Sequence, residues 1–223
     1  MFETLKLIFF AAAILFGLLF LLARKKGTGK SSRLLLIALA LAALGGVTIL
    51  VNNIRMNGNI QALKSSPVVT RALEVSSSVL ISDNSLTAIR ENSKGQKIQE
   101  PYVLVPVDCV HNWRNRSEDH YEIASGDSCW SGGQFVSADQ ANQCKTILFY
   151  DTFVLEMPYQ SSSGRKTTGR SESKTVYLYD VETESLFDYK VFDTNLPTIT
   201  RGTPNMRVST QTILDWAKEE LSR

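Results

Sequence analysis

Two long apolar stretches near the start of the chain constrain its fold more than any other feature. Residues 7–23 contain no charged side chain, and residues 34–51 contain one polar side chain, Thr48. At 1.5 Å per residue, helices of these lengths reach roughly 25–27 Å, close to the thickness of a bilayer's hydrocarbon core. A helix satisfies its backbone groups within a single segment. The sequence therefore predicts a hairpin of two transmembrane helices within residues 1–51.

The connector between these stretches, residues 24–33, is strongly basic and contains no acidic side chain. Its basic residues are Arg24, Lys25, Lys26, Lys30 and Arg33. Basic residues accumulate in the cytoplasmic connections of membrane proteins, so we expect this connector in the cytoplasm. The N-terminus and everything after residue 51 are then expected outside the cytoplasm.

The first apolar stretch lacks the layout of a cleaved signal peptide. Before this stretch, the negative charge of Glu3 balances the positive charge of Lys6. The positive cluster follows the stretch, whereas in a signal peptide it precedes the apolar stretch. We therefore expect an uncleaved span and a two-span integral protein of the inner or plasma membrane.

Charge is distributed unevenly along the chain. Residues 1–51 carry six basic side chains and one acidic one, a net charge of +5. Because the whole chain has a net charge of +2, residues 52–223 carry −3. A nucleic-acid-binding domain usually presents a basic face, so this balance favours other partners. We expect the lipid bilayer and a membrane or envelope protein as partners, and no nucleic acid.

The rest of the chain predicts an α+β domain. Residues 52–66 are polar and are expected to form a juxtamembrane linker or a short helix leaving the bilayer, which leaves residues 67–223 for the domain. The runs that favour strands are residues 79–82, 86–90, 102–110, 146–157, 174–181 and 186–192. The last two runs flank a short acidic turn and predict a hairpin. The sheet is expected to be mostly antiparallel.

A C-terminal helix and a loop complete the expected domain. Ser209 or Thr210 can cap the helix, and apolar residues recur behind it at helical spacing. This apolar stripe consists of Ile213, Leu214, Ala217 and Leu221, and Trp216 lies beside it. Residues 160–173 have no apolar side chain, so they bury too little to offset their ordering entropy. This segment is expected to be a mobile loop.

All three cysteines and both histidines lie between residues 109 and 144. They are Cys109, His111, His120, Cys129 and Cys144. Thiols outside the cytoplasm tend to pair. Cys129 and Cys144 lie in polar stretches, whereas Cys109 lies in an apolar strand, so the favoured disulfide is Cys129–Cys144.

Two chemical alternatives remain open for this region. Cys109 and His111 lie two apart on a strand and could begin a metal site, with two more ligands from His120, Cys129 and Cys144, although the spacings match no usual zinc module. Cys129 could serve as a nucleophile, although thiol catalysis needs a nearby imidazole and no histidine follows residue 120. The usual nucleotide, serine-hydrolase and zinc-protease motifs are absent, and no cofactor is expected.

The leading hypothesis is a membrane-anchored, non-enzymatic domain that serves protein interaction, assembly or sensing in the cell envelope. A membrane-tethered enzyme that uses a thiol or a metal within residues 109–144 is the alternative. The identity of a small-molecule ligand does not follow from the sequence.

Overall fold

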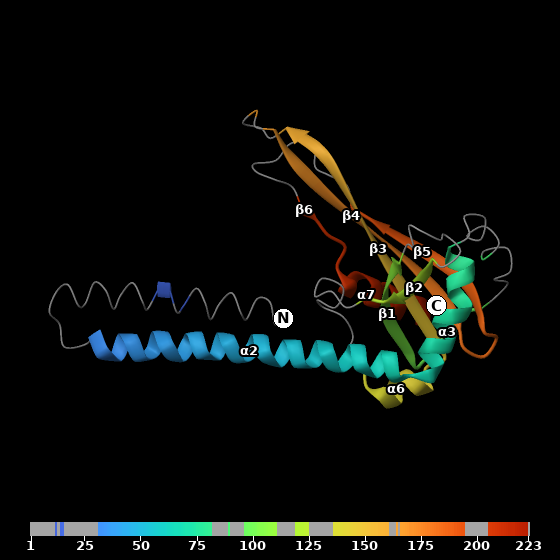
Figure 1. Ribbon diagram of the computed structural model, residues 1–223, viewed down its shortest axis with the longest axis horizontal. Helices are drawn as coiled ribbons and strands as arrows, with labels where there is room; N and C mark the ends of the chain where they lie inside the picture. Colours follow the sequence, from blue (N-terminus) through green and yellow to red (C-terminus); the bar gives the residue numbers. More distant parts are fainter. Residues whose placement is uncertain are drawn as a thin grey trace. The chain divides into compact units, whose positions relative to one another are not determined.

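The structure is a computed structural model that describes residues 12, 14–15, 31–81, 89, 96–110, 119–124, 136–160, 164, 166–194 and 205–222 (Figure 1). The chain divides into two compact units, Met1–Asn57 and Gly58–Arg223. Each unit is described by itself.

Helix α2 (Ser31–Ser65) contains the second predicted span. Its segment Leu39–Ser65 is long and apolar enough to cross a membrane, and it is the one helix of this kind among the described residues. Of the two alternatives for residues 52–66, a linker or a short helix, the segment is helical as far as Ser65, but as a continuation of α2 and not as a separate element. Nothing in that segment interrupts a helix before Pro67, which disfavours helical geometry at Ser66. The predicted span 7–23 and most of the connector lie outside the described residues.

Helix α3 (Pro67–Leu80) follows a single non-helical residue. Ser66 caps it by accepting a hydrogen bond from the Val69 amide at 3.2 Å, and proline suits the first helical position. The predicted strand at residues 79–82 is wrong, because Val79 and Leu80 are helical. Burial of Val69, Ala72 and Ser76 on one helical face outweighs the weak strand preference of the valines.

In the described part of the chain, six strands form one mixed sheet. They are β1 (Tyr102–Val110), β2 (His120–Ile123), β3 (Thr146–Gln160), β4 (Lys166–Asp180), β5 (Ser185–Asp193) and β6 (Asn205–Met206). The order is β2-β1-β3-β4-β5, and β6 pairs with β4. Pairing is parallel between β1 and β3 and between β4 and β6, and antiparallel elsewhere. The sheet is mixed, but antiparallel pairs predominate among the described residues, as expected from the sequence. The parallel exception arises because the connection through α6 (Ala138–Gln143) returns the chain parallel to β1.

Strands β3 and β4 also occupy most of the segment that was predicted to be a mobile loop. The ladder continues to the pair Gln160 and Lys166, so Gln160 and residues 166–173 are strand residues. The prediction for residues 160–173 is therefore wrong over most of its length. The polar composition of this segment reflects exposure to solvent rather than a lack of backbone pairing.

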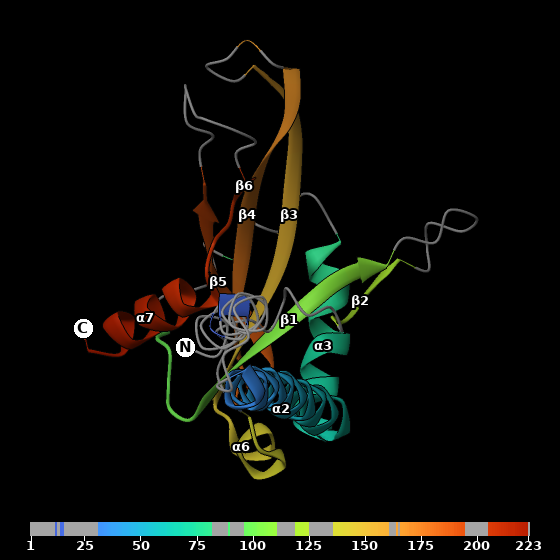
Figure 2. The same cartoon turned by 90° about the vertical axis from the view of Figure 1, so that its left-hand side faces the viewer.

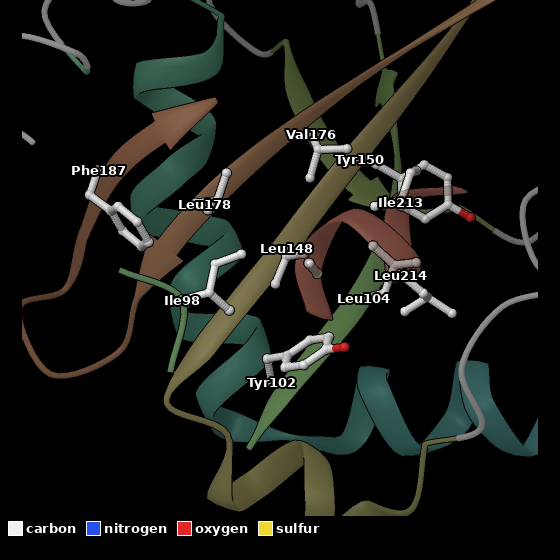
Figure 3. Packing of buried hydrophobic residues seen from close by; sticks show 11 residues of the cluster. Ile98, Tyr102, Leu104, Leu148, Tyr150, Val176, Leu178, Phe187, Ile213 and Leu214 are labelled. Carbon is white, nitrogen blue, oxygen red and sulfur yellow. The ribbon is translucent and has the colours of Figure 1, made fainter. Parts of the chain in front are cut away.

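Helices cover both faces of the sheet: α7 (Thr210–Leu221) lies on one face and α3 on the other (Figure 2). Ser209 caps α7 by accepting from the Gln211 amide at 3.1 Å, which confirms the predicted C-terminal helix. Side chains that alternate along the strands meet α7 in a buried cluster (Figure 3). Its members are Ile98, Tyr102, Leu104, Leu148, Tyr150, Val176, Leu178, Phe187, Ile213, Leu214 and Ala217.

Replacing Ile213 with alanine tests whether α7 is part of this core. Ile213 is fully buried, so Ile213→Ala should destabilise the domain by about 2–5 kcal/mol through lost burial and an unfilled cavity. Urea unfolding of the full chain in detergent, followed by tryptophan fluorescence, measures the change. Thr212→Ala, at an exposed position of the same helix, is the control and should change stability by less than about 0.5 kcal/mol. Equal effects of the two substitutions would contradict the assignment.

Candidate functional site

Neither Cys109 nor Cys144 forms a disulfide. Cys144 lies just before β3, where its Sγ donates to the Ala141 carbonyl at 3.2 Å. The following residue, Lys145, donates its amide to the Pro101 carbonyl, so Cys144 lies near the start of β1, whereas Cys109 lies near its end. The described residues contain no disulfide, so the predicted Cys129–Cys144 bond is absent at Cys144. Cys129 itself lies outside the described residues.

The environment of both thiols keeps them protonated. Burial raises the pKa of Cys144 to about 11. Burial, followed by the negative charges of Asp151 and Asp119, raises the pKa of Cys109. The thiolate is the form that attacks substrates and binds metals, so these two cysteines are poorly suited to either task.

The proposed cluster of Cys109, His111 and His120 does not converge in the described part of the chain. The β1–β2 register pairs Cys109 with Tyr121 and Val110 with His120. Because neighbouring strand residues point to opposite faces, Cys109 and His120 lie on opposite faces of the sheet. His111 lies outside the described residues. Among the described residues, no group of three or more histidine, cysteine or acidic side chains could hold a metal ion.

A polar cluster that the sequence did not predict lies on the face that α3 covers. It contains Cys109, Tyr121, Asp151 and Tyr177, which come from β1, β2, β3 and β4 and share this face by strand register. The hydroxyl groups of the two tyrosines are hydrogen-bonded to each other. Burial first, and then the charge of Asp151, raises the pKa of Tyr177 to about 12, and burial also raises the pKa of Tyr121. The two hydroxyl groups and the thiol of this cluster therefore stay protonated at neutral pH. No sequence spacing reveals the cluster, because strand pairing alone brings it together.

The outer part of β3 is a second feature that the sequence did not predict. Strand β1 pairs with β3 only as far as Asp151, whereas β4 pairs with β3 along its full length to Gln160. Residues 152–160 of β3, here called the β3 edge, therefore have no strand partner on the β1 side among the described residues. Phe153 is 63% exposed and Leu155 is 44% exposed, and Val154 and Met157 are also exposed. Edges in soluble proteins are usually protected by charge or distortion, so an apolar edge is a natural place for another chain to pair.

A small pocket of about 120 Å³ lies beside this edge and is here called the β4 pocket. It is lined by Thr152, Val154, Arg170, Glu172, Lys174, Asn205, Met206 and Arg207. The side chain of Lys174 is only 4% exposed, and its Nζ lies 3.2 Å from Oε1 of Glu172. The same ammonium group lies 5.2 Å from the centre of the Tyr150 ring, a favourable cation–π distance.

A larger hollow of about 270 Å³ lies between α7, β5 and the segment before β1. Ile98, Phe187 and Trp216 contribute apolar surface, and Trp216 donates its ring N–H to Glu220 at 3.2 Å. Two lysines and two acidic residues also line the hollow, so its charge is balanced and indicates no particular ligand.

Comparisons with protein-family models, with curated proteins and with solved structures found no match. The described residues define an α+β domain with a mixed sheet and a C-terminal helix, on a chain with one helix apolar enough to cross a membrane. The functional argument therefore rests on the geometry of the β3 edge and the β4 pocket.

The raised pKa of Cys144 predicts slow alkylation. A variant that keeps Cys144 but carries Cys109→Ser and Cys129→Ser isolates this thiol. At pH 8, a thiol with a pKa near 8.5 is roughly one quarter ionised, whereas one with a pKa of about 11 is ionised to roughly one part in a thousand. Iodoacetamide should therefore react at least about 100-fold more slowly in native buffer than in urea. The rate should rise as the pH approaches 11, and equal rates in buffer and urea at pH 8 would contradict the assigned environment.

Proposed function

We propose that this chain is a two-span membrane protein whose outer domain binds a partner protein in the cell envelope. The β3 edge receives an extended segment of that partner as an additional strand. The observation that supports this proposal is the length of apolar strand that β3 extends beyond the end of β1 with no partner on that side among the described residues.

Strand addition uses both the backbone and the side chains of an edge. Backbone hydrogen bonds along the β3 edge supply affinity, and side chains on each face select the incoming residues. Phe153 and Leu155 lie on one face of β3, and Val154 lies on the other. Burying a large apolar side chain contributes about 1.5–3 kcal/mol to binding, so apolar contacts on both faces of β3 stabilise an incoming strand.

The membrane part of the proposal is supported by composition and by helix α2. The segment Leu39–Ser65 is apolar enough to cross a bilayer, and the basic residues of segment 24–33 favour a cytoplasmic connector. A first span at residues 7–23 then returns the N-terminus to the outer side. The domain Gly58–Arg223 lies outside the cytoplasm in this arrangement.

Reporter fusions test this topology. Alkaline phosphatase fused after Arg223 should be active, and green fluorescent protein at the same place should be dark, because the domain is expected outside the cytoplasm. Fusions within segment 24–33 are the matched control and should show the reverse pattern. If the C-terminal fluorescent-protein fusion is bright and the C-terminal phosphatase fusion is inactive, the domain lies in the cytoplasm and the proposed envelope function is wrong.

Photocrosslinking in cells tests the β3 edge. Benzoylphenylalanine at Phe153 should yield an adduct whose partner peptide, identified by mass spectrometry, is the same when the probe is moved to Leu155. Leu155→Lys should reduce the adduct of the Phe153 probe by at least about tenfold, because strand addition would bury an unpaired charge. The control probe is Val191, an apolar residue of β5 that is 43% exposed, close to the exposure of Leu155.

Equal adduct yields from Phe153 and Val191 would argue against a specific edge. The second readout is amide hydrogen exchange of the full chain in detergent after the identified partner is added. Within residues 152–160, the amides that point away from β4 should become protected, because they gain acceptors from the added strand; Pro158 has no amide hydrogen to report. Protection elsewhere without a change at these residues would overturn strand addition as the mode of binding.

A further inference from the structure

The β4 pocket is built by strand register on one face of the sheet. Arg170, Glu172 and Lys174 alternate along β4, so their side chains share a face. Their partners across the ladder in β3 are Glu156, Val154 and Thr152, in that order. On the other side, Arg170 pairs with Asn205 of β6, and Arg207, just after the end of β6, also lines the pocket. The pocket therefore combines side chains from three adjacent strands.

Among the described residues, ion pairing leaves one positive charge in excess around this pocket. Arg170 lies 2.7 Å from Glu156, and Lys174 lies 3.2 Å from Glu172. Arg207 also lines the pocket, and it has no ion-pair partner among the described residues. Three cations thus face two carboxylates, although residues 52–223 as a whole carry −3. The positive charge is a local property of this site.

Burial of Lys174 makes the pocket more than a group of surface charges. A lysine is rarely buried to this degree unless it is paired, because desolvation of the ammonium group costs several kcal/mol. Glu172 and the ring of Tyr150 hold the ammonium group in place. The amide of Asn205 and the hydroxyl of Thr152 add neutral groups that can donate hydrogen bonds to an anion.

The size of the pocket limits what it can hold. With a volume of about 120 Å³, the pocket can hold a small group and a few water molecules. This space suits a compact group such as a carboxylate or a phosphate.

We propose that the β4 pocket binds a compact oxyanion, either a carboxylate or a phosphate. Arg207 supplies the uncompensated charge, and Arg170 and Lys174, positioned by Glu156 and Glu172, supply further donors. An arginine can donate two parallel hydrogen bonds to such a group. This inference is independent of strand addition to the β3 edge, because it concerns the face of the sheet and not the backbone edge.

Thermal unfolding of the purified full chain in a non-ionic detergent tests the proposal. Inorganic phosphate and acetate are added separately up to roughly 50 mM, with chloride keeping the ionic strength constant, so that a bound anion raises the midpoint by mass action. The expected result is a saturable rise with at least one of the two probes. A rise with phosphate alone, or with acetate alone, identifies which oxyanion chemistry the pocket prefers.

Arg207→Gln is the decisive variant, because it removes the excess charge at an exposed position. It should weaken the apparent dissociation constant by about tenfold or more, as expected when a charged hydrogen bond is lost. Arg71→Gln is the matched control: Arg71 is exposed and pairs with Glu184 in the turn between β4 and β5, outside the pocket, so its removal should leave binding unchanged. Asn205→Ala should weaken binding without a change in net charge. Absence of any saturable rise, or equal rises in the wild type and Arg207→Gln, would overturn the proposal.

Discussion

The backbone ladder between β3 and β4 is the constraint on which the rest of the domain depends. It runs without interruption from the pair Thr146 and Asp180 to the pair Gln160 and Lys166. The inner half lies between β1 and β5, where Phe149 packs edge-to-face on Tyr179 at 6.2 Å between ring centres. The outer half continues beyond both neighbours in the same register. The buried inner half therefore holds the outer half of the β3–β4 ladder in place, where its side chains are exposed to solvent.

The change from core to exposed surface is visible along one face of β4. Leu178 and Val176 pack under α7, and the next residues on that face are Lys174, Glu172 and Arg170. Lys174 lies at the boundary, where the Tyr150 ring on one side and Glu172 on the other stabilise its charge. The same boundary separates the part of β3 that β1 covers from the part that it leaves open. The proposed anion pocket and the proposed strand-addition edge therefore adjoin each other because the apolar core ends there.

Local sequence patterns predicted the elements that pack by alternation or by helical spacing. The strand at residues 102–110, the hairpin on either side of residues 182–185 and the C-terminal helix after Ser209 all appear in the structure. The helical Val79 and Leu80 show where such patterns fail, because tertiary burial of α3 overrides a weak strand preference. The loop prediction fails at residues 166–173 because the pattern there suggested too little structure. Their polar composition reports solvent exposure, whereas their conformation is imposed by pairing with β3.

The sequence by itself determined the apolar segment of α2, the net acidity of the following domain and the α+β composition, because these follow from residue type and short-range spacing. Tertiary structure alone decided which side chains meet. Cys109 lies beside Tyr121 and on the opposite face from His120, and Lys174 and Arg207 line one pocket although they lie far apart along the chain. Strand register decides these contacts. A shift of one residue would move every side chain of a strand to the other face, and no local pattern encodes the parallel return of β3 beside β1.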